Sequence, residues 1–238
     1  MCRTCRTADL SRRAFLGGAV LLAAASTPVG TLFAADPPPA GTVAVSPAEA
    51  LVRLQEGNAR YVGGISKNRD YSVGRAARAL DQRPFAAIIS CADSRVAPEL
   101  IFDQGPGDLF VIRVAGNFVN EDGLASLEYG TAVLGVSLVL VLGHTNCGAI
   151  KATIDVVKNG ATLPGHLPAL AASIAPAVEA AMAENPPDLL VAATAENVRQ
   201  NVDYLKDAKP IVSDQVAAGT VAVGGAIYDL STGVVAAV

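Results

Sequence analysis

Two short stretches of the chain carry side chains that could bind a metal and move a proton. The first, CADSR, places Cys91, Asp93 and Arg95 within five residues. The second, HTNC, places His144 three residues before Cys147. Two thiolates and one imidazole are typical ligands of tetrahedral zinc, and three protein ligands leave the fourth position open for water or substrate. The two stretches therefore predict a catalytic zinc site, provided that the fold brings them together.

Each stretch directly follows a run of apolar residues that is typical of a buried strand. These runs are FAAIIS, residues 85–90, and SLVLVLG, residues 137–143. A third run, LFVIRVA, covers residues 109–115, and a segment of helical period, 122–135, separates it from SLVLVLG. Strand, helix and strand in alternation predict a parallel sheet. Functional groups gather beyond the carboxyl ends of such strands, so we expect the two stretches to converge there.

The remaining patterns predict helices and one antiparallel strand pair. A capping pattern that begins at Ser46 predicts a helix over about 47–61. After the HTNC stretch the chain is mostly helical in pattern to about Lys209. Residues 220–238 then predict two strands joined by a turn at Ser231–Gly233. The expected fold class is α/β, with a mainly parallel sheet flanked by helices and an antiparallel C-terminal strand.

The first 35 residues have the pattern of an export signal. Arginines precede an apolar run of twelve residues, 14–25, which is short for a membrane span. The pair Arg12–Arg13 ahead of this run resembles a twin-arginine signal, with an ordinary Sec signal or an uncleaved anchor as the alternatives. We expect residues 1–35 to be a signal peptide without a clear cleavage site, 36–45 a linker and 46–238 the catalytic domain. The mature protein would be periplasmic or otherwise extracytoplasmic, with no stable membrane span.

Composition argues against a nucleic-acid-binding protein. The formal charge is −4, tryptophan is absent and aromatic residues make up 5% of the chain. Nucleic-acid-binding domains instead present a basic surface, and many stack bases on aromatic side chains. The hydrophobic fraction of 51%, with 17% charged residues, is ample for a globular core.

A disulfide is the alternative to a metal site. Cys91 and Cys147 are the only cysteines that follow the expected signal, and exported proteins often use an even number of cysteines in disulfides. Such a bridge would leave His144, Asp93 and Arg95 without a role. The complete set of residues therefore favours a metal.

The C-x-D-x-R and H-x-x-C patterns together resemble the signature of the β-class carbonic anhydrases. The resemblance covers essentially the whole chain after the leader, in the segments QRPFAAIISCADSRV, PGDLFVIRVAGN, SLEYG, GHTNCGAI, ENVRQNVDYL and GAIYDLSTG. It implies an enzyme that reversibly hydrates carbon dioxide to bicarbonate and a proton. It also implies one Zn²⁺ per chain, bound by Cys91, His144 and Cys147, and a homodimer or a dimer of dimers.

The chemistry of zinc, taken with this resemblance, assigns roles to the residues beside the ligands. Zinc in an open site lowers the pKa of water to about 7 and so provides hydroxide to attack carbon dioxide. Asp93 is expected to accept a hydrogen bond from that water, and Arg95 to hold the Asp93 carboxylate bidentately. In the alternative state, which resembles a closed form of some family members, Asp93 is a fourth zinc ligand.

The resemblance also implies a small substrate pocket, which in the family lies across a dimer interface. The positions that match this pocket are Gln82, Phe110, Ala115, Tyr129 and Gly148. Simple core packing is the alternative for Phe110 and Tyr129. Ala115 stands where valine is common in the family, so a roomier pocket is expected.

Two other functions fit the same residues. Related enzymes of this fold hydrolyse carbon disulfide or carbonyl sulfide, and a small change in the access channel would decide between these substrates. A non-catalytic zinc- or bicarbonate-binding protein is the second alternative, but it gives the Asp93–Arg95 pair no role. His166 is the only histidine besides His144, and we expect it in a surface loop rather than in proton transfer.

Overall fold

The computed structural model describes residues 45–67 and 69–238. The expected signal peptide, 1–35, and all but the last residue of the expected linker, 36–45, lie outside the described residues. The expectations of export and of a cleaved leader therefore stay predictions. Within the described ranges, no helix is both long enough and apolar enough to cross a membrane.

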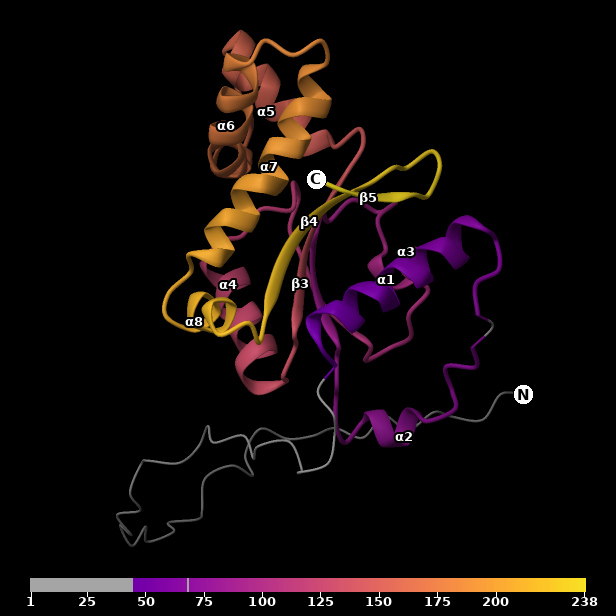
Figure 1. Ribbon diagram of the computed structural model, residues 1–238. Coiled ribbons are helices and arrows are strands. Elements are labelled where there is room, and N and C mark those ends of the chain that lie inside the picture. The colour runs from indigo at the N-terminus through magenta and orange to yellow at the C-terminus, as the bar shows by residue number, and fades with distance from the viewer. Residues whose placement is uncertain (1–44, 68) are drawn as a thin grey trace, which may run out of the picture. The chain divides into compact units, whose positions relative to one another are not determined.

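A five-stranded sheet forms the centre of the described part of the chain (Figure 1). In spatial order its strands are β2 (Leu109–Arg113), β1 (Ala86–Ser90), β3 (Leu138–His144), β4 (Ala222–Tyr228) and β5 (Val235–Ala237). The first four strands run parallel, and β5 is antiparallel to β4. This topology confirms the predicted fold class, including the antiparallel C-terminal pair.

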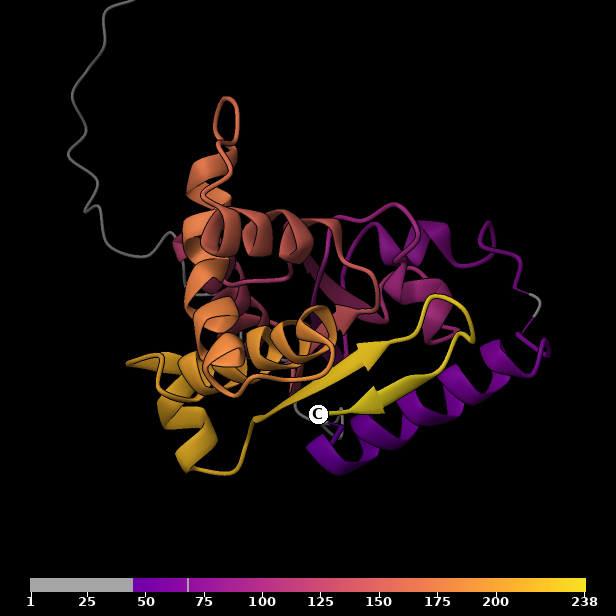
Figure 2. The ribbon, with the colours of Figure 1, turned by 90° about the horizontal axis from the view of Figure 1, so that it is seen from above.

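Helices cover both faces of the sheet. The helices of the described residues are α1 (Pro47–Val62), α2 (Arg75–Arg78), α3 (Pro98–Ile101), α4 (Glu121–Glu128, continued by a π-helical turn, Tyr129–Val133), α5 (Gly148–Asn159), α6 (Leu167–Ala183), α7 (Leu189–Lys206) and α8 (Ile211–Ala217). Helices α1 and α3 pack on one face, and α4, α7 and α8 pack on the other (Figures 1 and 2). Helices α5, α6 and part of α7 form a third apolar cluster that contains both buried cysteines.

The predicted strands agree with the structure to within two residues at either end, but one prediction of burial was wrong. Strands β1 and β3 are buried along their whole length, as expected of inner strands. Strand β2 is only half-buried, because it is the edge strand of the described sheet and one of its sides has no neighbouring strand. An apolar run identifies a strand, but it does not tell an edge strand from an inner one.

The start of α1 follows from its capping sequence. The Ser46 hydroxyl accepts a hydrogen bond from the main-chain N–H of Glu49 at 3.2 Å, and Pro47 occupies the first turn. The Glu49 carboxylate does not complete the capping pattern but accepts a hydrogen bond from Arg53 at 2.5 Å. The predicted helix is therefore confirmed, with a cap that uses the serine side chain alone.

A buried carboxylate ties the segment after α1 to the body of the domain. The Asp103 side chain is 3% exposed and accepts hydrogen bonds from Arg60 Nε at 2.5 Å and Arg69 Nη1 at 2.7 Å. Burial raises the pKa of Asp103, but the two guanidinium groups outweigh it and bring this pKa below its ordinary value. Because the folded pKa is depressed, the stabilisation is present near neutral pH and is lost as the pH falls through the folded pKa.

Two glycines let α7 lie close to the sheet. A Cβ on Gly143 of β3 would lie 2.7 Å from Val198, and a Cβ on Gly225 of β4 would lie 2.6 Å from the same side chain. Side chains at either position would push the helix away. The packing of Val198 over these two glycines therefore sets the position of α7. One of them, Gly143, directly precedes His144, the last residue of β3.

Candidate metal centre

The two chemical stretches meet at the carboxyl ends of neighbouring strands. Strands β1 and β3 are parallel partners, with Ser90 opposite Leu142. Cys91 is the first residue after β1, His144 is the last residue of β3, and Cys147 caps the start of α5. This register brings the three side chains together, so the predicted convergence is confirmed.

The three side chains form a compact, buried donor set. One sulfur from each cysteine and one ring nitrogen of His144 lie within 4.8 Å of one another. The exposed fractions of Cys91, His144 and Cys147 are 4%, 0% and 1%. Zinc bonds of about 2.0–2.3 Å require ligand atoms roughly 4 Å apart or less, so this spacing is close to that of a loaded site.

His144 is oriented as a ligand. Its Nδ1 lies 2.9 Å from the carbonyl oxygen of Thr145, which can only accept, so Nδ1 carries the proton. The other ring nitrogen, Nε2, then presents a lone pair, and it is buried with no hydrogen-bond partner in the described residues. An imidazole whose remote N–H is held by a carbonyl is typical of metal-binding histidines. The residues present therefore fit zinc.

The two thiols are free, and each changes the pKa of the other. The side-chain interaction with Cys147 lowers the pKa of Cys91 against the opposing effect of burial. His144 and the main-chain N–H of Gly116, which lies 3.2 Å from the Cys91 sulfur, lower this pKa further. Conversely, the interaction with Cys91, together with burial, raises the pKa of Cys147. Both thiols become thiolates when a divalent cation binds, because the cation favours the deprotonated form of each. The free state of both sulfurs gives no support to the disulfide alternative.

Asp93 and Arg95 form the bidentate pair that the sequence predicts. Arg95 donates from Nε to Asp93 Oδ1 at 2.9 Å and from Nη2 to Oδ2 at 2.7 Å. These hydrogen bonds hold the pKa of Asp93 well below its ordinary value, against the opposing effect of burial. Oδ2 lies 3.9 Å from Nε2 of His144, so the carboxylate borders the donor set while its oxygens are engaged by Arg95.

A second arginine, which sequence reasoning missed, fixes the main chain of this loop. Arg113, the last residue of β2, donates from Nε to the carbonyl of Cys91 at 3.0 Å and from Nη2 to the carbonyl of Asp93 at 2.7 Å. It thereby holds the loop on both sides of residue 92. The available signal was a charged residue inside the apolar run LFVIRVA. An edge strand tolerates such a residue, and an inner strand rarely does.

The five positions matched to the substrate pocket are distributed over different parts of the fold. Ala115 and Gly148 adjoin the centre, because Ala115 precedes the glycine that contacts Cys91 and Gly148 begins α5. Phe110 and Tyr129 pair with ring centroids 6.4 Å apart on the β2 side, where Tyr129 is 47% exposed. Gln82 is exposed in the segment before β1. Their roles as substrate contacts stay predictions.

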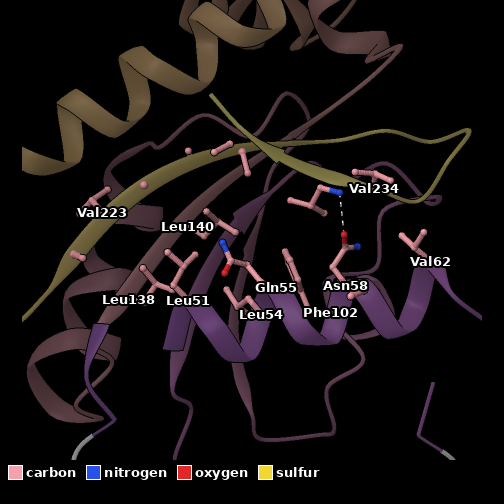
Figure 3. Close-up of a pocket in the computed structure, with 17 residues that line it drawn as sticks. Leu51, Leu54, Gln55, Asn58, Val62, Phe102, Leu138, Leu140, Val223 and Val234 are labelled. Atoms are coloured by element: carbon pink, nitrogen blue, oxygen red, sulfur yellow. Dashed lines mark hydrogen bonds between the residues drawn. The ribbon is translucent and has the colours of Figure 1, made fainter. Parts of the chain in front are cut away.

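A large cavity lies away from this centre. It has a volume of about 540 Å³ and lies between α1 and strands β3, β4 and β5 (Figure 3). Its lining is apolar apart from Gln55 and Asn58, and Asn58 is engaged as acceptor for the main-chain N–H of Val235 at 3.0 Å. Among residues 45–67 and 69–238, no titratable side chain lines it. The cavity therefore has no part in the chemistry of the cysteines and the histidine.

The fold and the donor set together define a class: an α/β protein with a two-cysteine, one-histidine metal centre at the carboxyl edge of a parallel sheet. Comparison with known proteins agrees with this class. The family model described as carbonic anhydrase matches residues 86–235. Carbonic anhydrase 2 of Mycobacterium tuberculosis is 37% identical over 189 residues, which cover 79% of this chain and 91% of that protein.

Two solved structures show the same fold. The β-carbonic anhydrase of Coccomyxa, solved in complex with acetazolamide, has a TM-score of 0.63 at 29% identity, over 79% of this chain and 86% of that one. A structure from a study of two tetrameric β-carbonic anhydrases of Sordaria macrospora has a TM-score of 0.64 at 23% identity, over 69% of this chain and 86% of that one. The chain belongs to the carbonic anhydrase family, in its β class.

Proposed function

We propose that this chain is a zinc enzyme that catalyses the reversible hydration of carbon dioxide to bicarbonate and a proton. The observation that carries the proposal is the buried donor set of Cys91, His144 and Cys147, with an unpaired imidazole nitrogen, bordered by the Asp93–Arg95 pair. Three ligands make an open site of the catalytic kind. Its membership of the carbonic anhydrase family names the reaction.

The residues around the donor set have separable roles. When bound, zinc supplies the Lewis acidity that makes water a hydroxide donor near neutral pH. Asp93, whose pKa is depressed, is an ionised acceptor at neutral pH and can orient an O–H group beside the ligands. Arg95 engages both carboxylate oxygens and so restrains Asp93 from becoming a ligand itself. Arg113 fixes the main chain that carries both Cys91 and Asp93.

This arrangement favours the open over the closed state of the site. Asp93 as a fourth ligand would need an oxygen that is free to turn toward the metal. In the structure both of its oxygens are engaged by Arg95, and Oδ1 also accepts the main-chain N–H of Arg95 at 2.9 Å. We therefore infer that Asp93 acts as an acceptor rather than as a ligand.

The test is metal analysis combined with a hydration assay. We expect about one zinc per chain and rapid hydration of carbon dioxide in stopped-flow measurements, with loss of both after chelation and recovery on adding zinc. Carbon disulfide and carbonyl sulfide serve as competing substrates in the same preparation. Zinc binding without hydration would contradict the enzyme assignment, and preferential hydrolysis of a sulfur compound would favour the second function that the sequence allows.

We further propose that the active form is a homodimer or a dimer of dimers. The support is the exposure of apolar side chains in and near the segments that carry the pocket positions: Leu80, two residues from Gln82, is 88% exposed, and Tyr129 is 47% exposed. Exposed apolar side chains mark an interaction surface where they form a contiguous patch. The Sordaria macrospora proteins that share the fold are tetrameric. A second copy would cover these side chains and bring Gln82 and Tyr129 into a shared pocket.

We also propose that the protein is exported by the twin-arginine route, on the basis of Arg12 and Arg13 ahead of the apolar run. Thiolate ligands are open to oxidation outside the cytoplasm, and a route that carries folded proteins would allow zinc to be inserted first. Replacing both residues, Arg12→Lys with Arg13→Lys, should retain the enzyme in the cytoplasm with its activity intact. Cell fractionation with activity measurement checks this, and undiminished export would indicate the Sec route.

A further inference from the structure

The segment ENVRQN, residues 196–201, has no part in the chemistry described above. In the structure it lies on α7, and Asn197 is 1% exposed there. The Asn197 side chain donates from Nδ2 to the carbonyl of Gly116 at 2.9 Å. The N–H of the same glycine donates to the sulfur of Cys91 at 3.2 Å. The buried amide of Asn197 is thus linked to the Cys91 sulfur through one residue, Gly116, by two hydrogen bonds.

The backbone at Gly116 is restricted by its conformation and by its neighbours. Its φ is +88°, in the region that favours glycine, and a Cβ there would lie 2.5 Å from Ile174 Cδ1 and 3.3 Å from Ala149 Cβ. The residue is therefore enclosed by α5 and α6 on one side. On the other side Asn197 holds its carbonyl. The carbonyl and the N–H of Gly116 belong to consecutive peptide planes, so this bond restrains the N–H by fixing the backbone at the Gly116 Cα.

The helix that carries Asn197 is itself tied to the donor set. The adjacent residue, Val198, packs over Gly143 and Gly225, and Gly143 directly precedes His144. Asn197 thus reaches Gly116 from a helix whose distance from the sheet is fixed by the contact of Val198 with Gly143, beside His144. The same turn of α7 therefore contacts the backbone beside the Cys91 sulfur, through Asn197, and the end of the strand that carries His144, through Val198.

We propose that Asn197 is a positioning residue of the metal centre, which acts through Gly116 to hold a main-chain N–H on the Cys91 sulfur. An N–H bond to a thiolate withdraws electron density from sulfur and fixes the direction of its remaining lone pairs. Partners one step removed from the metal commonly change metal affinity or activity by about 10–100-fold. The proposal rests on the proposed role of Cys91 as a ligand.

The chain offers a matched control one helical turn further on. Asn201 accepts the main-chain N–H of Val119 through Oδ1 at 2.8 Å, and its Nδ2 donates to the carbonyl of Asn197 at 2.8 Å. It therefore holds the same loop from the same face of α7, but at a residue that does not bond the sulfur. Its Nδ2 lies 3.5 Å from Oδ1 of Asn197, at the limit of a hydrogen bond, so its link to the Asn197 side chain is weak. Truncating Asn201 removes the same atoms as truncating Asn197.

The experiment compares Asn197→Ala and Asn201→Ala in the full chain, each loaded with zinc and, separately, with cobalt(II). Loss of the N–H bond makes the sulfur a stronger electron donor, which lowers the energy of charge transfer to the metal. It also leaves the sulfur more easily protonated and less firmly oriented, which speeds metal release. In Asn197→Ala we expect the thiolate-to-cobalt charge-transfer bands to shift to lower energy and zinc to be released to a chelator about 10-fold faster. In Asn201→Ala both should stay close to those of the parent protein, with comparable loss of thermal stability.

Equal changes in the two alanine variants, or no change in either, would overturn the proposal, because a merely structural role is shared by both residues. If Asn197→Ala does not fold, Asn197→Asp keeps the shape and removes the donor, and the same band shift is expected. A parent protein that binds neither metal would instead overturn the ligand assignment itself. Metal binding by the parent with unmoved bands in both Asn197 variants would overturn the positioning role alone.

Discussion

Replacing Arg95 with alanine should abolish carbon dioxide hydration while zinc remains bound. In the structure the guanidinium occupies both oxygens of Asp93, and one of these oxygens lies 3.9 Å from Nε2 of His144. Without the arginine the carboxylate is free to bind the metal, since carboxylate oxygen is a good zinc ligand. The position that water needs is then filled. We expect activity to fall by a hundredfold or more, on the order of what a positioned acid–base group contributes.

A double variant separates this blocking effect from loss of the arginine itself. In Arg95→Ala with Asp93→Ala no carboxylate remains to take the open position, so part of the activity should return. Recovery should stay incomplete because the aligning acceptor is also gone. Arg199→Ala is the matched control: Arg199 forms an exposed ion pair with Glu196 at 2.8 Å on α7, and its loss should leave hydration unchanged. Full activity in Arg95→Ala would show that the guanidinium does not restrain Asp93.

Replacing His144 with alanine should remove both zinc and activity. His144 is completely buried, and its Nε2 has no hydrogen-bond partner in the described part of the chain. Loss of this ligand leaves only two thiolates, and a structural or catalytic zinc site has at least three protein ligands. We expect zinc content to fall close to zero after dialysis against a chelator, and hydration to fall to the uncatalysed rate.

The control for this variant is the other histidine of the chain. His166 is exposed at the start of α6, so His166→Ala should keep zinc and fold. Thermal unfolding of the zinc-free proteins shows whether His144→Ala still folds. Normal zinc content in His144→Ala would contradict the ligand assignment. Slower hydration in His166→Ala with normal zinc would point to His166 in proton transfer, against our expectation of a surface residue.

Some features of the metal centre were predictable because their determinants are local. Asp93 and Arg95 are two residues apart, so one turn brings their side chains together regardless of the rest of the fold. The start of α1 is similarly local, because Ser46 caps an N–H only three residues ahead. The apolar runs before Cys91 and His144 predicted buried strands, because a short continuous apolar run is typical of a strand covered on both faces.

Other features could not be predicted because they depend on which strands are neighbours and on how closely helices pack. The exposure of β2 follows from its place at the edge of the sheet. The pattern of apolar residues within β2 does not show which strands lie beside it. The bonds of Arg113 to two carbonyls of the Cys91 loop require β2 to lie beside β1. Tyr129 was assigned to a pocket, yet its large exposure becomes apparent only in the folded chain.

The sequence by itself determined the kind of chemistry and the class of fold. Two thiols and an imidazole favour zinc because of their chemical type, which the sequence states directly. The spacing of apolar residues distinguishes strand from helix, because it is a property of residues close together in the chain. Only the tertiary structure decided that Gly116 places its N–H on Cys91 and that Asn197, far along the chain, holds Gly116. A hydrogen bond between residues far apart in the sequence depends on the register of the strands and on the distance of the helix from the sheet. Both are set by the packing of the whole core.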